Sequence, residues 1–249
     1  MSDLLQDSGG STILVCYENH LKEDHSMRGN LRESITGVRL EPVWSLHLNA
    51  SFCYEVLSLL APDVNAEQYF RLISPERATD IFIRQTRFVR TLFSSGCFTF
   101  NLPVQALISA STFNSICREL MPGVIIEIQD PNTLLSLNTT DICLLKNSVH
   151  EIIARGGKVW LDDITPEMVG FFLTLKLPLA GVKTDRSILN SLCSDGRELS
   201  SLVETCRQLA PLVVVEGIET TEMQQWAQDA GAQAGQGYLW SGKAFMYPL

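Results

Sequence analysis

"KVWLDDI", residues Lys158–Ile164, is the stretch from which the fold is most readily argued. Its apolar part, Val159–Leu161, has the composition of a buried strand and leads directly into two adjacent carboxylates, Asp162 and Asp163. Neighbouring residues of an extended chain point to opposite faces, and two like charges side by side repel each other. The pair therefore needs a reason, and the candidates are a helix cap, a surface turn and a metal site.

Runs of similar composition recur along the chain of 249 residues. They predict eight strands, at 37–46, 51–57, 97–102, 123–128, 158–163, 179–185, 212–217 and 235–240. Helix-prone stretches lie between most of them, at 66–93, 103–120, 141–155, 167–175, 187–209 and 221–230. Strands that alternate with helices predict βαβ units and a parallel sheet, and near-continuous apolar runs such as "LVVV" predict a sheet covered on both faces.

The pattern favours an α/β fold, a modified TIM (β/α)8 barrel, which commonly occupies a chain of this length. The first connection is short enough for a hairpin, so we expect one strand to run antiparallel. A doubly wound sheet is the alternative, although no strand leads into a G-x-G-x-x-G turn. We expect the barrel domain to span residues 35–249, and residues 1–34 to be an N-terminal extension or linker.

The composition excludes several classes of protein. A net charge of −9 disfavours a DNA- or RNA-binding surface. The seven cysteines form no C-x-x-C pair, which argues against a zinc cage and for a reducing compartment. No apolar run approaches the roughly 18 residues of a membrane helix, and the N-terminus does not resemble a signal peptide. We therefore expect a cytoplasmic protein.

Polar side chains recur near the far ends of seven of the eight predicted strands. In chain order they are Glu55, Asn101, Glu127, Asp162 with Asp163, Lys183, Glu216 and Gln236. The carboxyl ends of parallel barrel strands open on one face, where active sites lie, so we expect these side chains to converge. Their oxygen atoms suit Mg²⁺, Mn²⁺ or Ca²⁺, and the adjacent aspartates suit two neighbouring ions that hydrolyse a phosphodiester.

Each of these residues also has a simpler explanation when it is considered alone. A carboxylate after a strand is usually a helix N-cap or a solvated loop residue. Asn101 before Pro103 fits a turn, Lys183 fits an exposed side chain or a partner of Asp185, and Gln236 fits a loop. Only their repeated placement favours a shared site.

The same residues lie in motifs that resemble those of the EAL domain family, the bacterial cyclic di-GMP phosphodiesterases. "VVVEGIET" resembles A-E-G-V-E-T, "QGYLWS" resembles Q-G-Y-L-F-S, and residues 161–187 match D-D-F-G-T-G…L-P…K-I-D-R-S without a gap. "YEVLSLL" stands at the position of E-A-L-x-R, "LEPVWSL" at Q-P-I, "FNLPVQAL" at N-x-S and "IIEIQD" at L-E-x-T-E. The resemblance covers about residues 38–245.

The resemblance implies hydrolysis of cyclic di-GMP to linear pGpG with two Mg²⁺ or Mn²⁺ ions, which would lower the level of this second messenger. It implies the metal ligands Glu55, Asn101, Glu127, Asp162, Asp163 and Glu216. It also implies catalytic roles for Lys183, which orients the attacking water, for Glu216 as ligand or base, and for Asp163. Supporting or substrate-binding residues would be Gln236, Glu219, Asp130 and Leu57.

The chain departs from the family motifs in four places, two single residues and two short stretches. Leu59 replaces the arginine of E-x-L-x-R, which helps to hold a ligand phosphate in the family. Ile164–Glu167 replaces the flexible F-G-T-G, so that two glycines are lost and a proline is gained. Asp130 replaces the glutamate that anchors this loop, and the terminal S-K-P is altered at Ser241–Lys243.

Two functions remain open at this stage. The chain is either a working phosphodiesterase with weakened binding or altered regulation, or a degenerate EAL protein that senses cyclic di-GMP or binds a protein without catalysis. Retention of every metal-type position favours the enzyme. The resemblance also implies a homodimer, which the altered loop disfavours. Residues 1–34 leave open a linker to an N-terminal regulatory domain in a longer protein, or a mobile arm.

Overall fold

A computed structural model of the chain describes residues 34–192 and 196–248. Its first two strands, β1 (Ile35–Ser45) and β2 (Ala50–Leu60), form an antiparallel hairpin paired from Ile35 with Leu60 to Ser45 with Ala50. The predicted hairpin is therefore confirmed. The expected extension over residues 1–34 lies outside the described residues, apart from residue 34.

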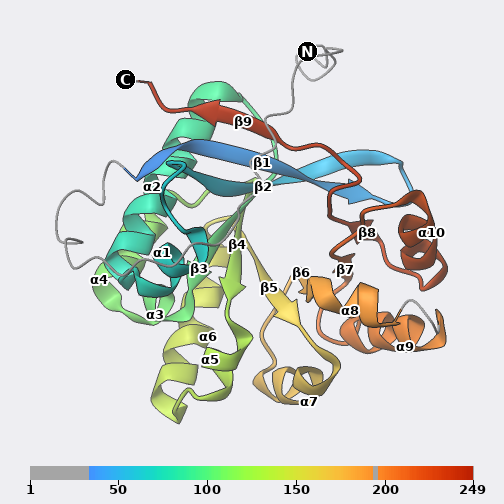
Figure 1. Ribbon diagram of the computed structural model, residues 1–249. Coiled ribbons are helices and arrows are strands. Elements are labelled where there is room, and N and C mark those ends of the chain that lie inside the picture. Colours follow the sequence, from blue (N-terminus) through green and yellow to red (C-terminus); the bar gives the residue numbers. More distant parts are fainter. Residues whose placement is uncertain (1–33, 193–195, 249) are drawn as a thin grey trace. The chain divides into compact units, whose positions relative to one another are not determined.

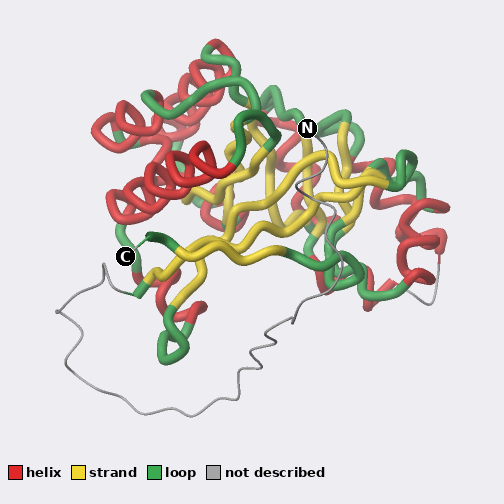
Figure 2. Tube along the Cα trace, turned by 90° about the horizontal axis from the view of Figure 1, so that it is seen from above, coloured by secondary structure: helices red, strands yellow, loops and turns green. Residues whose placement is uncertain are grey.

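The strands after the hairpin form a parallel series that closes on β1. They are β3 (Phe98–Pro103), β4 (Val124–Gln129), β5 (Lys158–Ile164), β6 (Gly181–Thr184), β7 (Leu212–Val215) and β8 (Ala234–Gly235). Trp44 and Ser45 of β1 pair antiparallel with β8, so β1 joins both ends of the series into a closed barrel of eight strands (Figures 1 and 2). The predicted modified TIM barrel with one antiparallel strand is confirmed.

The helices lie outside the strands of the barrel (Figure 2). They are α1 (Ala66–Leu72), α2 (Pro75–Leu92), α3 (Val104–Ile108), α4 (Ala110–Cys117), α5 (Pro131–Leu135), α6 (Thr139–Ala154), α7 (Pro166–Leu175), α8 (Arg186–Leu192), α9 (Gly196–Cys206) and α10 (Thr221–Asp229). Side-chain oxygens of Asn65, Ser74, Asn138 and Thr220 accept hydrogen bonds from the backbone at the starts of α1, α2, α6 and α10, as good N-caps do. Within the described residues, no helix combines the length and apolar character needed to cross a membrane.

The last predicted strand, over residues 235–240, is wrong beyond Gly235. The backbone N–H of Leu239 donates to the carbonyl of Ile218, and the N–H of Ile218 donates to the carbonyl of Gln236, so this segment pairs with a loop. Within this segment Trp240 stacks on Trp44 of β1 at a centroid distance of 5.5 Å. A ninth strand that was not predicted, β9 (Lys243–Met246), pairs antiparallel with β1.

Candidate metal centre

A layer of apolar side chains forms a floor across the inside of the barrel. It consists of Val43, Cys53, Ile125, Trp160, Val214 and Ala234. Two positions further along β2, β4, β5, β7 and β8 stand Glu55, Glu127, Asp162, Glu216 and Gln236. Residues two positions apart on a strand share a face, so the polar side chains form the next layer inside the barrel.

Glu55 is held by two amide groups, one on β3 and one on the residue that follows β8. The Nδ2 of Asn101 donates to its Oε1 at 2.6 Å, and the Nε2 of Gln236 donates to its Oε2 at 2.6 Å. Glu55, Asn101 and Glu127 lie within their strands, whereas Glu216 and Gln236 stand one residue past the ends of β7 and β8. The structure therefore brings together the residues that were expected to converge, although several lie deeper than a strand end.

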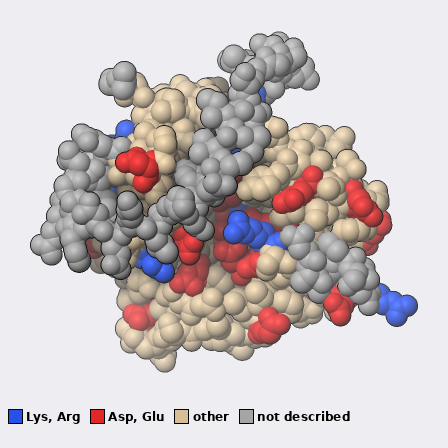
Figure 3. Space-filling view, in the orientation of Figure 1, with Lys and Arg blue, Asp and Glu red and all other residues tan. Residues whose placement is uncertain are grey.

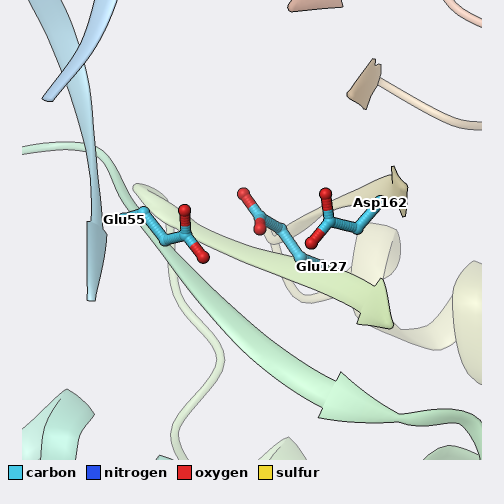
Figure 4. Close-up of side chains that lie close together, drawn as sticks. All are labelled: Glu55, Glu127 and Asp162. Atoms are coloured by element: carbon cyan, nitrogen blue, oxygen red, sulfur yellow. The ribbon is translucent and has the colours of Figure 1, made fainter. Parts of the chain in front are cut away.

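Lys183 of β6 lies at the centre of this layer. Its Nζ is 2.6 Å from Oε1 of Glu216, 3.1 Å from carboxylate oxygens of both Glu55 and Glu127, and 3.4 Å from Oδ1 of Asp162. Figure 4 shows the carboxylates of Glu55, Glu127 and Asp162 directed toward a common point. Lys183 is thus a buried counter-charge, and the reading of this residue as an exposed lysine does not apply.

Burial dominates the electrostatics of the layer. It raises the pKa of Glu216 to about 8 and that of Asp162 to about 6, against the opposing charge of Lys183. The pKa of Glu127 is also raised by burial. The pKa of Glu55 is lowered, because Lys183 and the two amide donors outweigh its burial. Burial alone would lower the pKa of Lys183, but the surrounding carboxylates raise it.

The adjacent aspartates are brought to one side of the strand by a β-bulge. Leu161 of β5 pairs with Val182 of β6, and the next pair is Ile164 with Thr184. Between these pairs β5 has one more residue than β6, which defines the bulge. Asp163 takes up the difference with a left-handed φ of 52°. Its carboxylate consequently lies near that of Asp162 instead of on the opposite face. The bulge therefore explains how two adjacent aspartates can contribute to one site.

The carboxylates form two overlapping sets that share Asp162. Ligand atoms of Glu55, Glu127 and Asp162 lie within 4.8 Å of one another, as do those of Asp162, Asp163 and Glu216. These five carboxylates and the Lys183 ammonium carry a formal charge of −4 when all are ionised, which two divalent cations would balance.

The side-chain oxygen of Asn101 also indicates a cation. The buried Oδ1 of Asn101 has no hydrogen-bond partner among the described residues, although the Nδ2 of the same amide is bonded. A buried acceptor without a partner is costly, and a cation would satisfy it. The donors are hard oxygen atoms, so the set fits divalent ions such as Mg²⁺, Mn²⁺ or Ca²⁺.

A cavity of about 750 Å³ opens above the carboxylate layer. Leu57 and Glu219, two of the predicted supporting residues, form part of its wall. Asp130 is instead the N-cap of α5, where it accepts hydrogen bonds from the backbone N–H and the hydroxyl of Thr133. Figure 3 shows Asp and Glu residues gathered around a hollow near the centre of the view, with Lys or Arg residues beside them.

Three charged residues of the cavity wall were not singled out from the sequence. They are Glu41, Asp185 and Arg186. Glu41 could have been found once β1 was known to be antiparallel, because it stands two positions from the floor residue Val43. Asp185 also accepts hydrogen bonds from the backbone N–H and hydroxyl of Ser187, at the start of α8.

Fold and site together define a class: a mixed eight-stranded barrel of the TIM type with a cluster of carboxylates, suited to divalent cations, at the mouth of its parallel strands. A model of the EAL domain family matches residues 54–243. The chain belongs to the EAL domain family.

Solved structures share the fold at low sequence identity. An EAL domain protein of Listeria monocytogenes is 20% identical, with a TM-score of 0.62 over 85% of this chain and 89% of that chain. A manganese and cyclic di-GMP complex of Klebsiella pneumoniae BlrP1 is 17% identical, with a TM-score of 0.69 over 86% of this chain and 57% of that chain. A calcium and cyclic di-GMP complex of BlrP1 gives a TM-score of 0.71, at 16% identity over 90% of this chain and 58% of that chain.

Two curated proteins are similar over part of their length. The biofilm architecture maintenance protein MbaA of Vibrio cholerae is 26% identical over 103 residues, which are 41% of this chain and 12% of that protein. The bifunctional diguanylate cyclase/cyclic di-GMP phosphodiesterase MucR of Pseudomonas aeruginosa is 25% identical over 134 residues, 52% of this chain and 19% of that protein. The matched segments thus span less than a fifth of either relative.

Proposed function

We propose that the chain is a cyclic di-GMP phosphodiesterase, which opens the cyclic dinucleotide to linear pGpG with two Mg²⁺ or Mn²⁺ ions. The observation that carries the proposal is the bulge at Asp163, which creates two overlapping carboxylate sets with Asp162 in common. Complexes of a structural neighbour with cyclic di-GMP and manganese or calcium support the choice of ligand and the need for a divalent ion.

The position of each residue in the layer supports a role in the proposed reaction. Glu55, Asn101, Glu127 and Asp162 would hold one ion, and Asp162, Asp163 and Glu216 the other. Bound divalent ions would polarise the phosphate, acidify a water molecule and stabilise the leaving oxygen. Gln236 keeps the carboxylate of Glu55 in place through its hydrogen bond.

Lys183 is suited to orient the attacking water. It keeps its positive charge because four carboxylates surround it, so it acts as a hydrogen-bond donor and not as a base. Glu216, the carboxylate nearest to this ammonium, is the proposed acceptor of the proton of the water.

The test is incubation with cyclic di-GMP and Mg²⁺ or Mn²⁺, with pGpG followed by chromatography. Asp162→Ala, which removes the carboxylate common to both sets, should abolish product while circular dichroism shows an unchanged fold. Asp80→Ala, at an exposed position of α2, is the matched control and should hydrolyse like the wild type. Equal hydrolysis by Asp162→Ala and the wild type would refute the site.

A second function, binding of cyclic di-GMP without hydrolysis, is favoured by one specific observation. Thr165 alone separates the end of β5 from Pro166, the first residue of α7, so a direct strand-to-helix junction stands where the family has a glycine-containing loop. Binding of cyclic di-GMP in a titration, together with absence of pGpG, would establish this second function and exclude the first.

A further inference from the structure

The cavity wall has a large excess of acidic residues for a site that receives an anionic ligand. Seven carboxylates line it: Glu41, Glu55, Asp162, Asp163, Asp185, Glu216 and Glu219. Only two basic residues accompany them in the described wall, Lys183 and Arg186. Lys183 is buried and makes ion pairs with four carboxylates, so its positive charge is already compensated within the protein.

Arg186 differs from Lys183 in exposure and in contacts. Its side chain is exposed at the cavity, and within the described part of the chain it makes no ion pair. It nevertheless lines the same cavity as Asp163, Lys183 and Glu216. Arg186 is therefore the cation of this wall that remains available to a ligand.

The backbone of Arg186 is held in a fixed place between two loops. It follows Asp185, which accepts two hydrogen bonds from Ser187 at the start of α8. On its other side it packs against Gly217, where an added Cβ would stand 2.7 Å from the carbonyl oxygen of Arg186. A guanidinium on a fixed backbone beside a cavity is well suited to bind a phosphate through two parallel hydrogen bonds.

A cyclic dinucleotide carries two phosphates on opposite sides of its ring. The paired ions would engage the phosphate that reacts, which leaves the second phosphate to be held by protein groups. Leu59 stands where the family motif has an arginine, and a leucine cannot bind a phosphate. We propose that Arg186 binds the non-reacting phosphate of cyclic di-GMP, an inference that rests on the proposed function.

The test is isothermal titration of the full chain with cyclic di-GMP in Ca²⁺, which reports binding instead of turnover. Arg186→Gln should weaken binding about tenfold or more, because hydrogen bonds to charged groups contribute at this level. Arg186→Lys should recover part of the loss, since it keeps the charge but not the paired geometry. Arg71→Gln, at an exposed position of α1 outside the cavity wall, should stay within about twofold of the wild type.

Three results would overturn the assignment. Binding by Arg186→Gln within about twofold of the wild type would show that Arg186 makes no phosphate contact. Equal weakening in Arg71→Gln and Arg186→Gln would show a general effect of lost charge and exclude a contact specific to Arg186. Absence of binding by the wild type would overturn the proposed function as well, which separates that failure from the first two. Thermal unfolding of each variant, expected to match the wild type, shows that the fold is retained.

Discussion

The Nζ of Lys183 lies 2.6 Å from Oε1 of Glu216, although β6 carries the first residue and the loop after β7 carries the second. This ion pair is the shortest of the four that Lys183 makes with the carboxylates around it. The lysine thereby neutralises part of a charge that the barrel could not otherwise bury.

Removal of this ammonium should destabilise the barrel most when divalent ions are removed. Lys183→Met leaves buried carboxylates without compensation, so we expect the free energy of unfolding in EDTA to fall by about 3–5 kcal/mol. Addition of Mn²⁺ should recover part of the loss. Urea unfolding measures both values, with Lys243→Met, an exposed lysine of β9, as the control. Unchanged stability of Lys183→Met in EDTA would contradict the role of Lys183 as the counter-charge.

Replacement of Asp163 should separate stability from ion binding. Asp163→Asn keeps a residue that tolerates a left-handed φ but removes one of two adjacent like charges, so unfolding in EDTA should require about 1 kcal/mol more. The same variant should bind Mn²⁺ more weakly and lose hydrolysis. Asp80→Asn, on the exposed surface of α2, should change neither property. A loss of stability in EDTA would show that the charge of Asp163 helps the fold.

Replacement by alanine should change the free energy of unfolding in opposite directions at two glycines. A Cβ on Gly170, within α7, would meet no atom within 4 Å, so Gly170→Ala should stabilise the protein by about 0.5–1 kcal/mol. Gly217 has a φ of +79°, and a Cβ there would collide with the carbonyl of Arg186. Gly217→Ala should therefore destabilise by more than about 1 kcal/mol. Chemical denaturation compares the two, and a loss of stability in Gly170→Ala would contradict the open space beside it.

Leu59 is the departure most easily tested by reversal. Leu59→Arg restores the residue type of the family motif on the strand that carries Glu55 and Leu57, so binding of cyclic di-GMP should tighten about tenfold. Leu48→Arg adds the same charge at an exposed position of the hairpin turn and should leave the dissociation constant unchanged. If Leu59→Arg gives no tighter binding, the substitution is not the weak point of the site.

The thiol of Cys97 should react with iodoacetamide at an unusually low pH. A hydrogen bond from Cys53 and the charge of Lys158 lower its pKa to about 7, against the effect of burial. Since the thiolate is the nucleophile, the alkylation rate should rise with pH and reach half its maximum near pH 7. Mass spectrometry follows the rate at this residue. Cys53→Ala removes the hydrogen-bond donor and should move the midpoint to higher pH; an unmoved midpoint would exclude that cause.

The order of elements was predictable because apolar runs and helix-prone stretches alternate along most of the chain. The antiparallel hairpin followed from the short connection between its strands, and the carboxylate layer from polar residues at similar positions in successive runs. The strand predicted at residues 236–240 was wrong, because the stacking of Trp240 on Trp44 and hydrogen bonds with Ile218 determine the backbone there.

The least predictable feature was the conformation of Asp163. Apart from glycine, few residues adopt a positive φ, and an aspartate after a strand gives no sign that it will do so. The bulge depends on pairing between β5 and β6, which is a property of the assembled barrel. The position of Lys183 among four carboxylates had the same origin, because three other strands and the loop after β7 supply its partners.

The closure of the barrel through β1 has a consequence for the biosynthesis of the protein. A ribosome releases β1 and β2 together, and they can pair at once because a short turn joins them. The second edge of β1 must wait for β8 and β9, and the Nε2 of Gln236 reaches Glu55 across 181 residues of sequence. Contacts of such long range form slowly, so the hydrogen-bonded layer around Glu55 should be complete only after the last strands have emerged. A nascent chain would therefore lack the complete carboxylate layer until its barrel has closed.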